Sequence, residues 1–140
     1  MRGHTLIELL FVLTLATVGA SAFVSSARKL RDRLVASAAR EMLVAGFADA
    51  RAISVRSGGA TLTIRGSSPA YRIDTAQRTG TWAPLDDPLL RLRLDAGRDS
   101  IKVEFDRMGL GRLASHSIQV SAGDATRSLI VSSYGRIRRR

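Results

Sequence analysis

One segment constrains the fold of this 140-residue chain more than any other, because no side chain between Leu9 and Ala27 carries a charge. A helix of about 20 apolar residues, rising about 1.5 Å per residue, matches the hydrocarbon thickness of a bilayer. Residues 4–27 are therefore predicted to form a transmembrane helix. One carboxylate, Glu8, lies near its start. Since an ionisable group inside a membrane segment is costly, Glu8 is expected to serve a function and to meet a positive partner.

The residues around Glu8 resemble the N-termini of type IV pilins and type II secretion pseudopilins. Residues 3–10 read Gly-His-Thr-Leu-Ile-Glu-Leu-Leu and follow a short basic leader, residues 1–3. The resemblance implies that a prepilin peptidase cuts between Gly3 and His4 and methylates the new N-terminal amine. It also implies that Glu8 faces the N-terminal amine of a neighbouring subunit during assembly. His4 departs from the Phe or Met that this family usually has.

An ordinary secretory signal peptide is the alternative interpretation of this N-terminus. Arg2 supplies a basic start, and Ala20-Ser21-Ala22 is typical of a signal-peptidase site. Against this alternative, the charge-free run continues through that tripeptide, and Glu8 falls where a signal peptide begins its apolar stretch. Under the alternative, the mature chain is a secreted basic protein that binds membranes or polyanions.

The helical pattern continues beyond the membrane segment, since no Pro or Gly follows Ala27 until Gly46. Residues 28–57 are predicted to be an amphipathic continuation of the same helix, ended by the run Ser57-Gly58-Gly59. A helix from about residue 5 to 56 would be roughly 78 Å long. Its apolar face is expected to comprise residues at steps of three and four, widened by three larger neighbours: Leu30, Leu34, Ala38, Met42, Ala45, Ala48 and Ala52, with Val35, Leu43 and Phe47.

From Ala60 onward the apolar residues recur at every second position, which predicts strands. Gly109-Leu110-Gly111 is expected to be a hairpin turn, and Trp82 to lie in the core or at the rim. The fold class is therefore α+β, with a long N-terminal helix packed on an antiparallel β-rich head, residues 58–135; the resemblance implies a pilin-like fold. The strands are expected around Leu62–Ile64, Tyr71–Ile73, Leu90–Leu94, Ile101–Phe105, Ile118–Val120 and, as the last one, Leu129–Ser132.

The chain offers few groups for catalysis or metal binding. His116 is the only histidine of the head, no Gly-x-Ser-x-Gly elbow is present, and His116 is expected to be a solvated loop residue. The pairs Asp86-Asp87 and Asp95/Asp99 are more typical of turns than of a calcium site. Neither an enzyme nor a cofactor or metal site is predicted.

The C-terminus is the most basic part of a chain with 22 basic and 12 acidic residues and a net charge of +10. No acidic residue follows Asp124, and residues 136–140 form a basic C-terminal tail. Arginine side chains suit phosphate oxygens, so the tail is a candidate contact for polyanions. A solvated tail without a ligand is the alternative.

The head most resembles the GspH/FimT family of pilins, through the segments Val103–Gly109 and Ile130–Arg138. Its Gly-Arg-x-Arg ending resembles that of the DNA-binding minor pilins of the FimT group. The resemblance implies that Gly135, Arg136 and Arg138 contact DNA, and Arg139 and Arg140 extend this site by charge alone.

The function expected from these resemblances is that of a minor type IV pilin that binds extracellular DNA in natural transformation. The alternative is a GspH-like minor pseudopilin of the type II secretion system. In either role the chain is expected to cross the bacterial inner membrane once, with its head in the periplasm, before it joins a pilus or pseudopilus. The expected partners are other pilin subunits, the prepilin peptidase and DNA.

Overall fold

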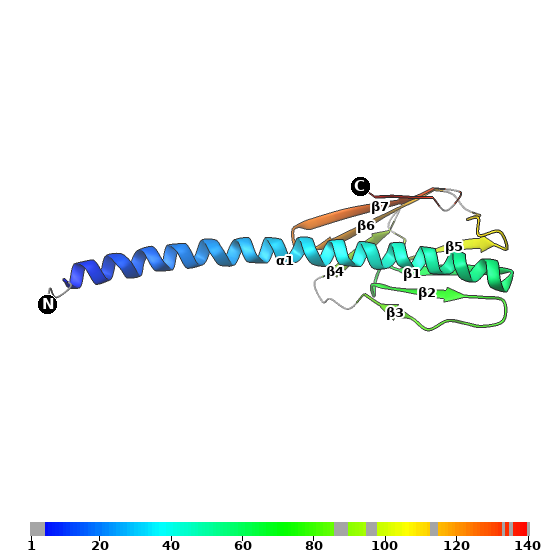
Figure 1. The fold of residues 1–140 in the computed structure, drawn as a ribbon, viewed down its shortest axis with the longest axis horizontal. Coiled ribbons are helices and arrows are strands. Elements are labelled where there is room, and N and C mark those ends of the chain that lie inside the picture. The colour runs from blue at the N-terminus through cyan, green and yellow to red at the C-terminus, as the bar shows by residue number, and fades with distance from the viewer. Residues whose placement is uncertain are drawn as a thin grey trace.

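The computed structural model describes residues 5–85, 90–94, 98–112, 115–132, 134 and 136–139, without the side chains of Ser21 and Ala22. Its single described helix, α1 (Leu6–Ser57), has 52 residues and a length of about 78 Å. The first half of α1 projects away from the head, and the second half lies along it (Figure 1). α1 ends at Gly58, whose φ of 80° is left-handed and therefore favours a residue without a Cβ. The predicted extent and end of the helix are confirmed.

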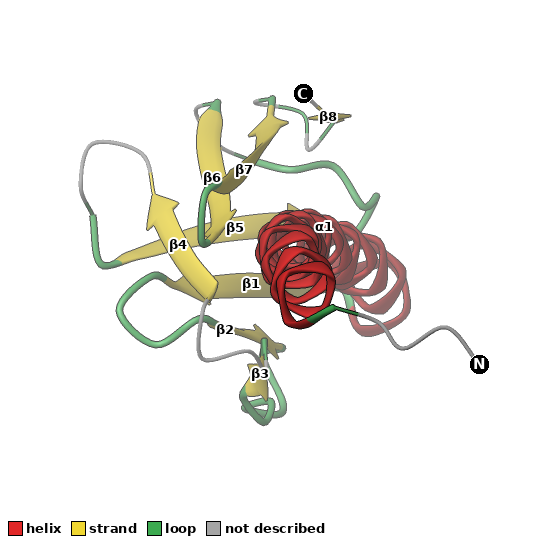
Figure 2. Ribbon diagram, turned by 90° about the vertical axis from the view of Figure 1, so that its left-hand side faces the viewer, coloured by secondary structure: helices red, strands yellow, loops and turns green. Residues whose placement is uncertain are grey.

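The described strands form two four-stranded sheets with antiparallel pairing (Figure 2). The first sheet has the order β3-β2-β1-β5 and contains β1 (Gly59–Arg65), β2 (Ala70–Asp74), β3 (Ala83–Pro84) and β5 (Ser100–Asp106). The second has the order β4-β6-β7-β8 and contains β4 (Leu90–Leu94), β6 (His116–Ala122), β7 (Ala125–Val131) and β8 (Ile137–Arg139). The α+β layout predicted from the sequence is therefore confirmed.

Each of the six predicted strands is present, and the structure adds β3 and β8. The prediction that the last strand is Leu129–Ser132 was wrong, because the chain turns back after β7 and Ile137–Arg139 pairs with it. The predicted turn at Gly109 is confirmed: Gly109 has a φ of 72°, and a bridge between Phe105 and Gly111 closes the turn.

The face of α1 that packs on the sheets differs from the predicted one. Leu34 and Met42 of the predicted stripe are 62% and 44% exposed, and Ala45, Ala48 and Ala52 are exposed too. Among the widening residues, Leu43 and Phe47 are buried, as the prediction required. The stripe that is buried consists of Ala36, Ala39, Leu43, Gly46, Phe47, Ala50 and Ser54.

The face of α1 that packs on the sheets combines small side chains with the large ones of Leu43 and Phe47. Both stripes repeat at steps of three and four, and at about 100° per residue their centres lie roughly 170° apart around the axis, so periodicity does not distinguish them. Both stripes contain several Ala residues, but only the buried one includes Gly46, where an added Cβ would lie 2.9 Å from the ring of Tyr71. Such small residues let the helix backbone approach the sheets. Phe47 then fills the remaining space and meets Phe105 edge to face, with ring centroids 6.5 Å apart.

The first half of α1 makes no comparable contact with the head. Its large apolar side chains are exposed, among them Ile7, Phe11 and Val18 at 76%, 66% and 68%. By length and composition, α1 is the one described helix that could cross a membrane.

Substitutions on the two stripes of α1 should separate the buried face from the exposed one. Phe47→Ala is expected to lower the free energy of unfolding of the head by about 3–5 kcal/mol, because it removes a core aromatic ring. Met42→Ala on the exposed stripe should change it by no more than about 0.5 kcal/mol. Urea unfolding of the full chain in detergent, followed by the fluorescence of Trp82, measures both. Equal losses would contradict the assignment of the faces.

Candidate functional site

The N-terminal candidates lie at the free end of α1. Gly3 and His4 are outside the described residues. Glu8 lies in the first turn of the helix, and its side chain is exposed in the isolated chain. A carboxylate at this position interacts favourably with the N-terminal end of the helix dipole. Because Glu8 is in the first turn of α1, it lies at the end of the helix farthest from the head (Figure 1).

The C-terminal candidates lie on a hairpin and not on a free tail; Gly135 and Arg140 are outside the described residues. Two hydrogen bonds close the turn: Ser132 N donates to the carbonyl oxygen of Arg136 at 2.8 Å, and Arg136 N donates to Ser132 Oγ at 3.1 Å. β8 begins at the next residue and pairs with β7. The basic residues of this segment therefore have defined directions.

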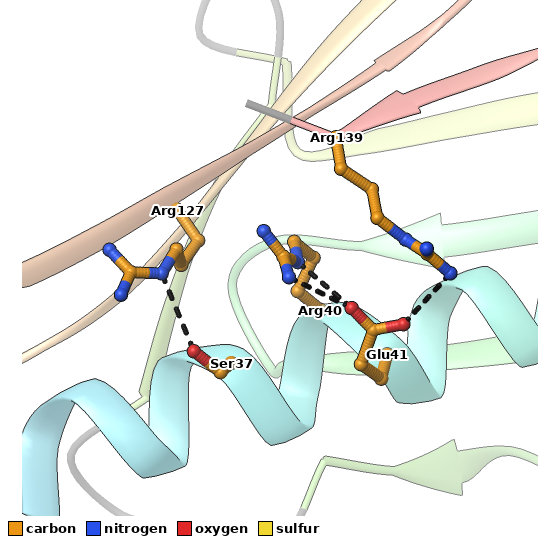
Figure 3. A network of polar contacts seen from close by, with 5 residues as sticks. All are labelled: Ser37, Arg40, Glu41, Arg127 and Arg139. Carbon is orange, nitrogen blue, oxygen red and sulfur yellow. Dashed lines mark hydrogen bonds and ion pairs between the residues drawn. The ribbon is translucent and has the colours of Figure 1, made fainter.

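Alternation along β8 divides the predicted DNA-binding arginines between two faces. Ile137 lies opposite Val131 and packs against the core, and Arg139 lies opposite the buried Leu129. Arg138 lies opposite Ile130, so it faces away from the helix. Arg139 instead reaches α1, where its Nη2 lies 3.1 Å from Glu41 Oε2 (Figure 3). The arginines predicted to bind DNA therefore do not form a single cluster.

Polar side chains of α1 contact the face of the second sheet that is turned toward the helix (Figure 3). Glu41 accepts hydrogen bonds from Nε and Nη2 of Arg40 at 3.2 and 2.9 Å, and it also pairs with Arg139. One turn away, Arg127 Nε donates to Ser37 Oγ at 3.4 Å. Two guanidinium groups, those of Arg40 and Arg139, thus pair with the Glu41 carboxylate, and the guanidinium group of Arg127 bonds to the helix one turn away. Sequence reasoning missed Glu41, because its partner Arg139 is distant in the sequence.

Arg51 ties two turns of the head to the helix. Its Nε donates to the carbonyl oxygen of Gly109 at 2.8 Å, and its Nη2 donates to that of Tyr134 at 3.4 Å. The first bond anchors the turn after β5, and the second anchors the turn between β7 and β8. Arg51 therefore helps to position the hairpin that carries Arg136 and Arg138.

Trp82 lies at the rim of the first sheet, partly exposed. The guanidinium carbons of Arg65 and Arg72 lie 4.2 and 4.8 Å from the centroid of a Trp82 ring. Arg72 also pairs with Asp74 at 3.0 Å. These contacts are typical of cation–π packing at a protein surface, and they keep Trp82 covered.

An open hollow of about 770 Å³ lies at the end of the head where α1 stops, between Ser57 and the turn after β5. Asp106 lies on its wall, and its Oδ1 accepts hydrogen bonds from the backbone N–H groups of Met108 and Leu110 at 2.8 and 2.9 Å. The bond from Leu110 is the main cause that lowers the pKa of Asp106 below its usual value. Asp106 thus stabilises a turn.

The structure corrects the prediction for His116. It is not a solvated loop residue but lies on β6 and is only 7% exposed. The alternation of His116 with Ile118 and Val120 explains this, because it places all three on the inner face of the sheet. Within the described ranges no three His, Asp or Glu side chains are grouped to hold a metal ion. The predicted turn residues Asp86, Asp87 and Asp95 lie outside those ranges.

Comparisons of this chain with protein-family models, curated proteins and solved structures gave no match. The site is therefore interpreted from its own geometry.

Removal of the Glu41 carboxylate should loosen β8 without unfolding the head. In Glu41→Gln, amide hydrogen exchange at Arg138, whose N–H faces β7, is expected to accelerate roughly twofold to fivefold, which is the effect of an exposed ion pair worth at most about 1 kcal/mol. Exchange in β6 should not change. Glu104→Gln on β5 removes an equal charge away from the network and serves as the control. Unchanged protection of β8 in Glu41→Gln would contradict this role.

Proposed function

We propose that this chain is a minor type IV pilin of the FimT-like kind: a filament subunit, held in a bacterial inner membrane before assembly, whose head binds extracellular DNA in natural transformation. The observation that carries the proposal is one unbroken helix, half exposed and apolar, half packed into an α+β head. A subunit built in this way offers a rod for packing with its neighbours and a head for contacts at the surface. No catalytic role is proposed.

The exposed apolar stripe of α1 is an argument that the chain assembles into a filament. Leu30, Leu34 and Met42 are 57%, 62% and 44% exposed, and they lie beyond the charge-free run that a bilayer covers. Contiguous apolar surface of this kind favours burial against a partner. Neighbouring subunits that pack helix to helix would cover this stripe together with the first half of α1.

Glu8 fits the same proposal. At the free end of α1, its carboxylate enters the apolar layer of a filament or a bilayer, where an unpaired charge is costly. The methylated N-terminal amine of another subunit supplies the opposite charge. The resulting pair sets the register of one subunit against the next.

The DNA contact is proposed at Arg136 and Arg138, which are exposed on the hairpin. Arg139 contributes less, because its guanidinium group pairs with Glu41. Contacts from arginine to phosphate oxygens carry little sequence information, so binding is expected to be independent of base sequence.

A GspH-like minor pseudopilin of the type II secretion system is the second candidate. It is favoured by the position of β8 in the second sheet and by the Arg139–Glu41 pair, which together give the basic C-terminus a structural role that needs no ligand. A deletion of the gene distinguishes the two. Loss of transformation with normal secretion supports the minor pilin, and the opposite phenotype supports the pseudopilin.

Replacement of Glu8 should block assembly. Glu8→Ala is expected to stay in the membrane fraction at the parental level and to be lost from sheared filaments, because the subunit amine no longer meets a carboxylate. Glu104→Ala, which removes a carboxylate of the head, is the matched control. Recovery of Glu8→Ala in filaments at the parental level would refute the assembly role.

Replacement of the hairpin arginines should weaken DNA binding and its salt dependence. For the full chain in detergent, Arg136→Gln with Arg138→Gln is expected to make the slope of log affinity against log salt shallower by about 1.8, since each phosphate contact accounts for about 0.9. Fluorescence anisotropy with a labelled duplex measures this. The control, Arg78→Gln with Arg107→Gln, removes the same charge from exposed loops elsewhere on the head. Equal slopes for the parent and the hairpin variant would exclude these two residues.

A further inference from the structure

The face of the second sheet that points away from α1 has an unusual composition. Its register places Arg93, Gln119 and Ser128 in one row, and Arg91, Ser121 and Thr126 in the next. All nine side chains that alternate onto this face from the four strands are basic, hydroxyl, amide or aliphatic, and none of these described residues is acidic: Arg91, Arg93, Ser117, Gln119, Ser121, Thr126, Ser128, Ile130 and Arg138.

Part of this face is hollowed. A depression of about 500 Å³ lies where the turn between β1 and β2, residues 66–69, packs against β4. Gly66 allows that close packing, because a Cβ there would lie 3.2 Å from the carbonyl oxygen of Leu92. We call this depression the outer groove and define it by Arg91, Arg93, Gln119, Ser121 and Thr126.

We propose that the outer groove binds the phosphodiester backbone of duplex DNA, and that this contact continues across the sheet to Arg138. The proposal rests on the DNA-binding function proposed above and extends it from the hairpin to a second surface. Arg91 and Arg93 are exposed, and guanidinium groups bind phosphate oxygens in a bidentate manner. The hydroxyl and amide groups on the floor of the groove supply further hydrogen-bond donors for phosphate oxygens, and such contacts do not distinguish one base from another.

The dimensions of the face suit an extended polyanion. Arg93 and Arg138 are separated by three strand spacings and by two residues along the strands, which places their Cα atoms roughly 16 Å apart. A strand of duplex DNA carries one phosphate per roughly 3.4 Å of axis, so this separation covers about four to five phosphates. A small anion would use only one end of the face.

The chemistry of the groove also favours duplex over single-stranded DNA. Proteins that bind single strands use aromatic side chains on which bases stack. None of the described residues that line the outer groove is aromatic. Contact is therefore made with the backbone alone, and both strands of a duplex keep their base pairs.

The test compares two pairs of arginines in the full chain in detergent, with a labelled duplex over several salt concentrations. Arg91→Gln with Arg93→Gln is expected to weaken binding about tenfold and to make the salt slope shallower by about 1.8, the effect of two lost phosphate contacts. Arg78→Gln with Arg107→Gln is again the control for net charge. Gln119→Glu places a carboxylate on the floor of the groove and should weaken binding even if the double substitution disturbs β4.

The outcomes separate this proposal from the function on which it rests. One outcome is that both groove variants bind DNA with parental affinity while Arg136→Gln with Arg138→Gln binds more weakly. This outcome would contradict DNA binding in the outer groove and leave the proposed function intact. If the parental protein does not bind DNA, both the outer-groove proposal and the proposed DNA-binding function are contradicted. A loss of heparin binding in the groove variants with unchanged duplex binding would assign the groove to an acidic polysaccharide and would also overturn the proposal.

Discussion

The close packing of one small-residue face of α1 on two sheets is the constraint on which the rest of the structure depends. Ala36, Ala39 and Ala50 bring the helix backbone near the sheets, and Gly46 leaves room for the ring of Tyr71. Phe47 then fills the centre of the core beside Phe105. Since this contact uses only one stripe in the second half of the helix, the whole first half and the opposite stripe remain exposed.

The same packing decides where the charges of the head lie. The helix carries Ser37 and Glu41 beside its buried face; Ser37 bonds to Arg127 of β7, and Glu41 pairs with Arg139 of β8. The hairpin is therefore held against the helix at its inner face. Arg138 and the arginines of β4 are left on the outer face of the sheet, away from the Glu41 carboxylate. One sheet thus separates a structural ion-pair network from a basic surface.

Much of the fold could be predicted because it follows from short-range patterns. The end of α1 at Gly58 and the positions of six strands follow from a glycine and from alternation within a few residues. The errors were of another kind. The buried helix face and the pairing of β8 each depend on a partner that is remote in the sequence, whereas the burial of His116 follows from its local alternation with Ile118 and Val120. The candidate site was predicted as a list of arginines, but their directions come from the register of β8.

The sequence by itself determined that this chain has a long helix with an apolar first half, a single early carboxylate at Glu8, and a β-rich head with a basic end. These are properties of composition and local period, which each segment carries without its partners. Only the tertiary structure decided which stripe of α1 is buried, that Arg139 pairs with Glu41, and that Arg91, Arg93 and Arg138 share one face. The physical reason is that two stripes of equal period lie on opposite sides of one helix, and which of them is buried depends on sheet residues that are remote in the sequence.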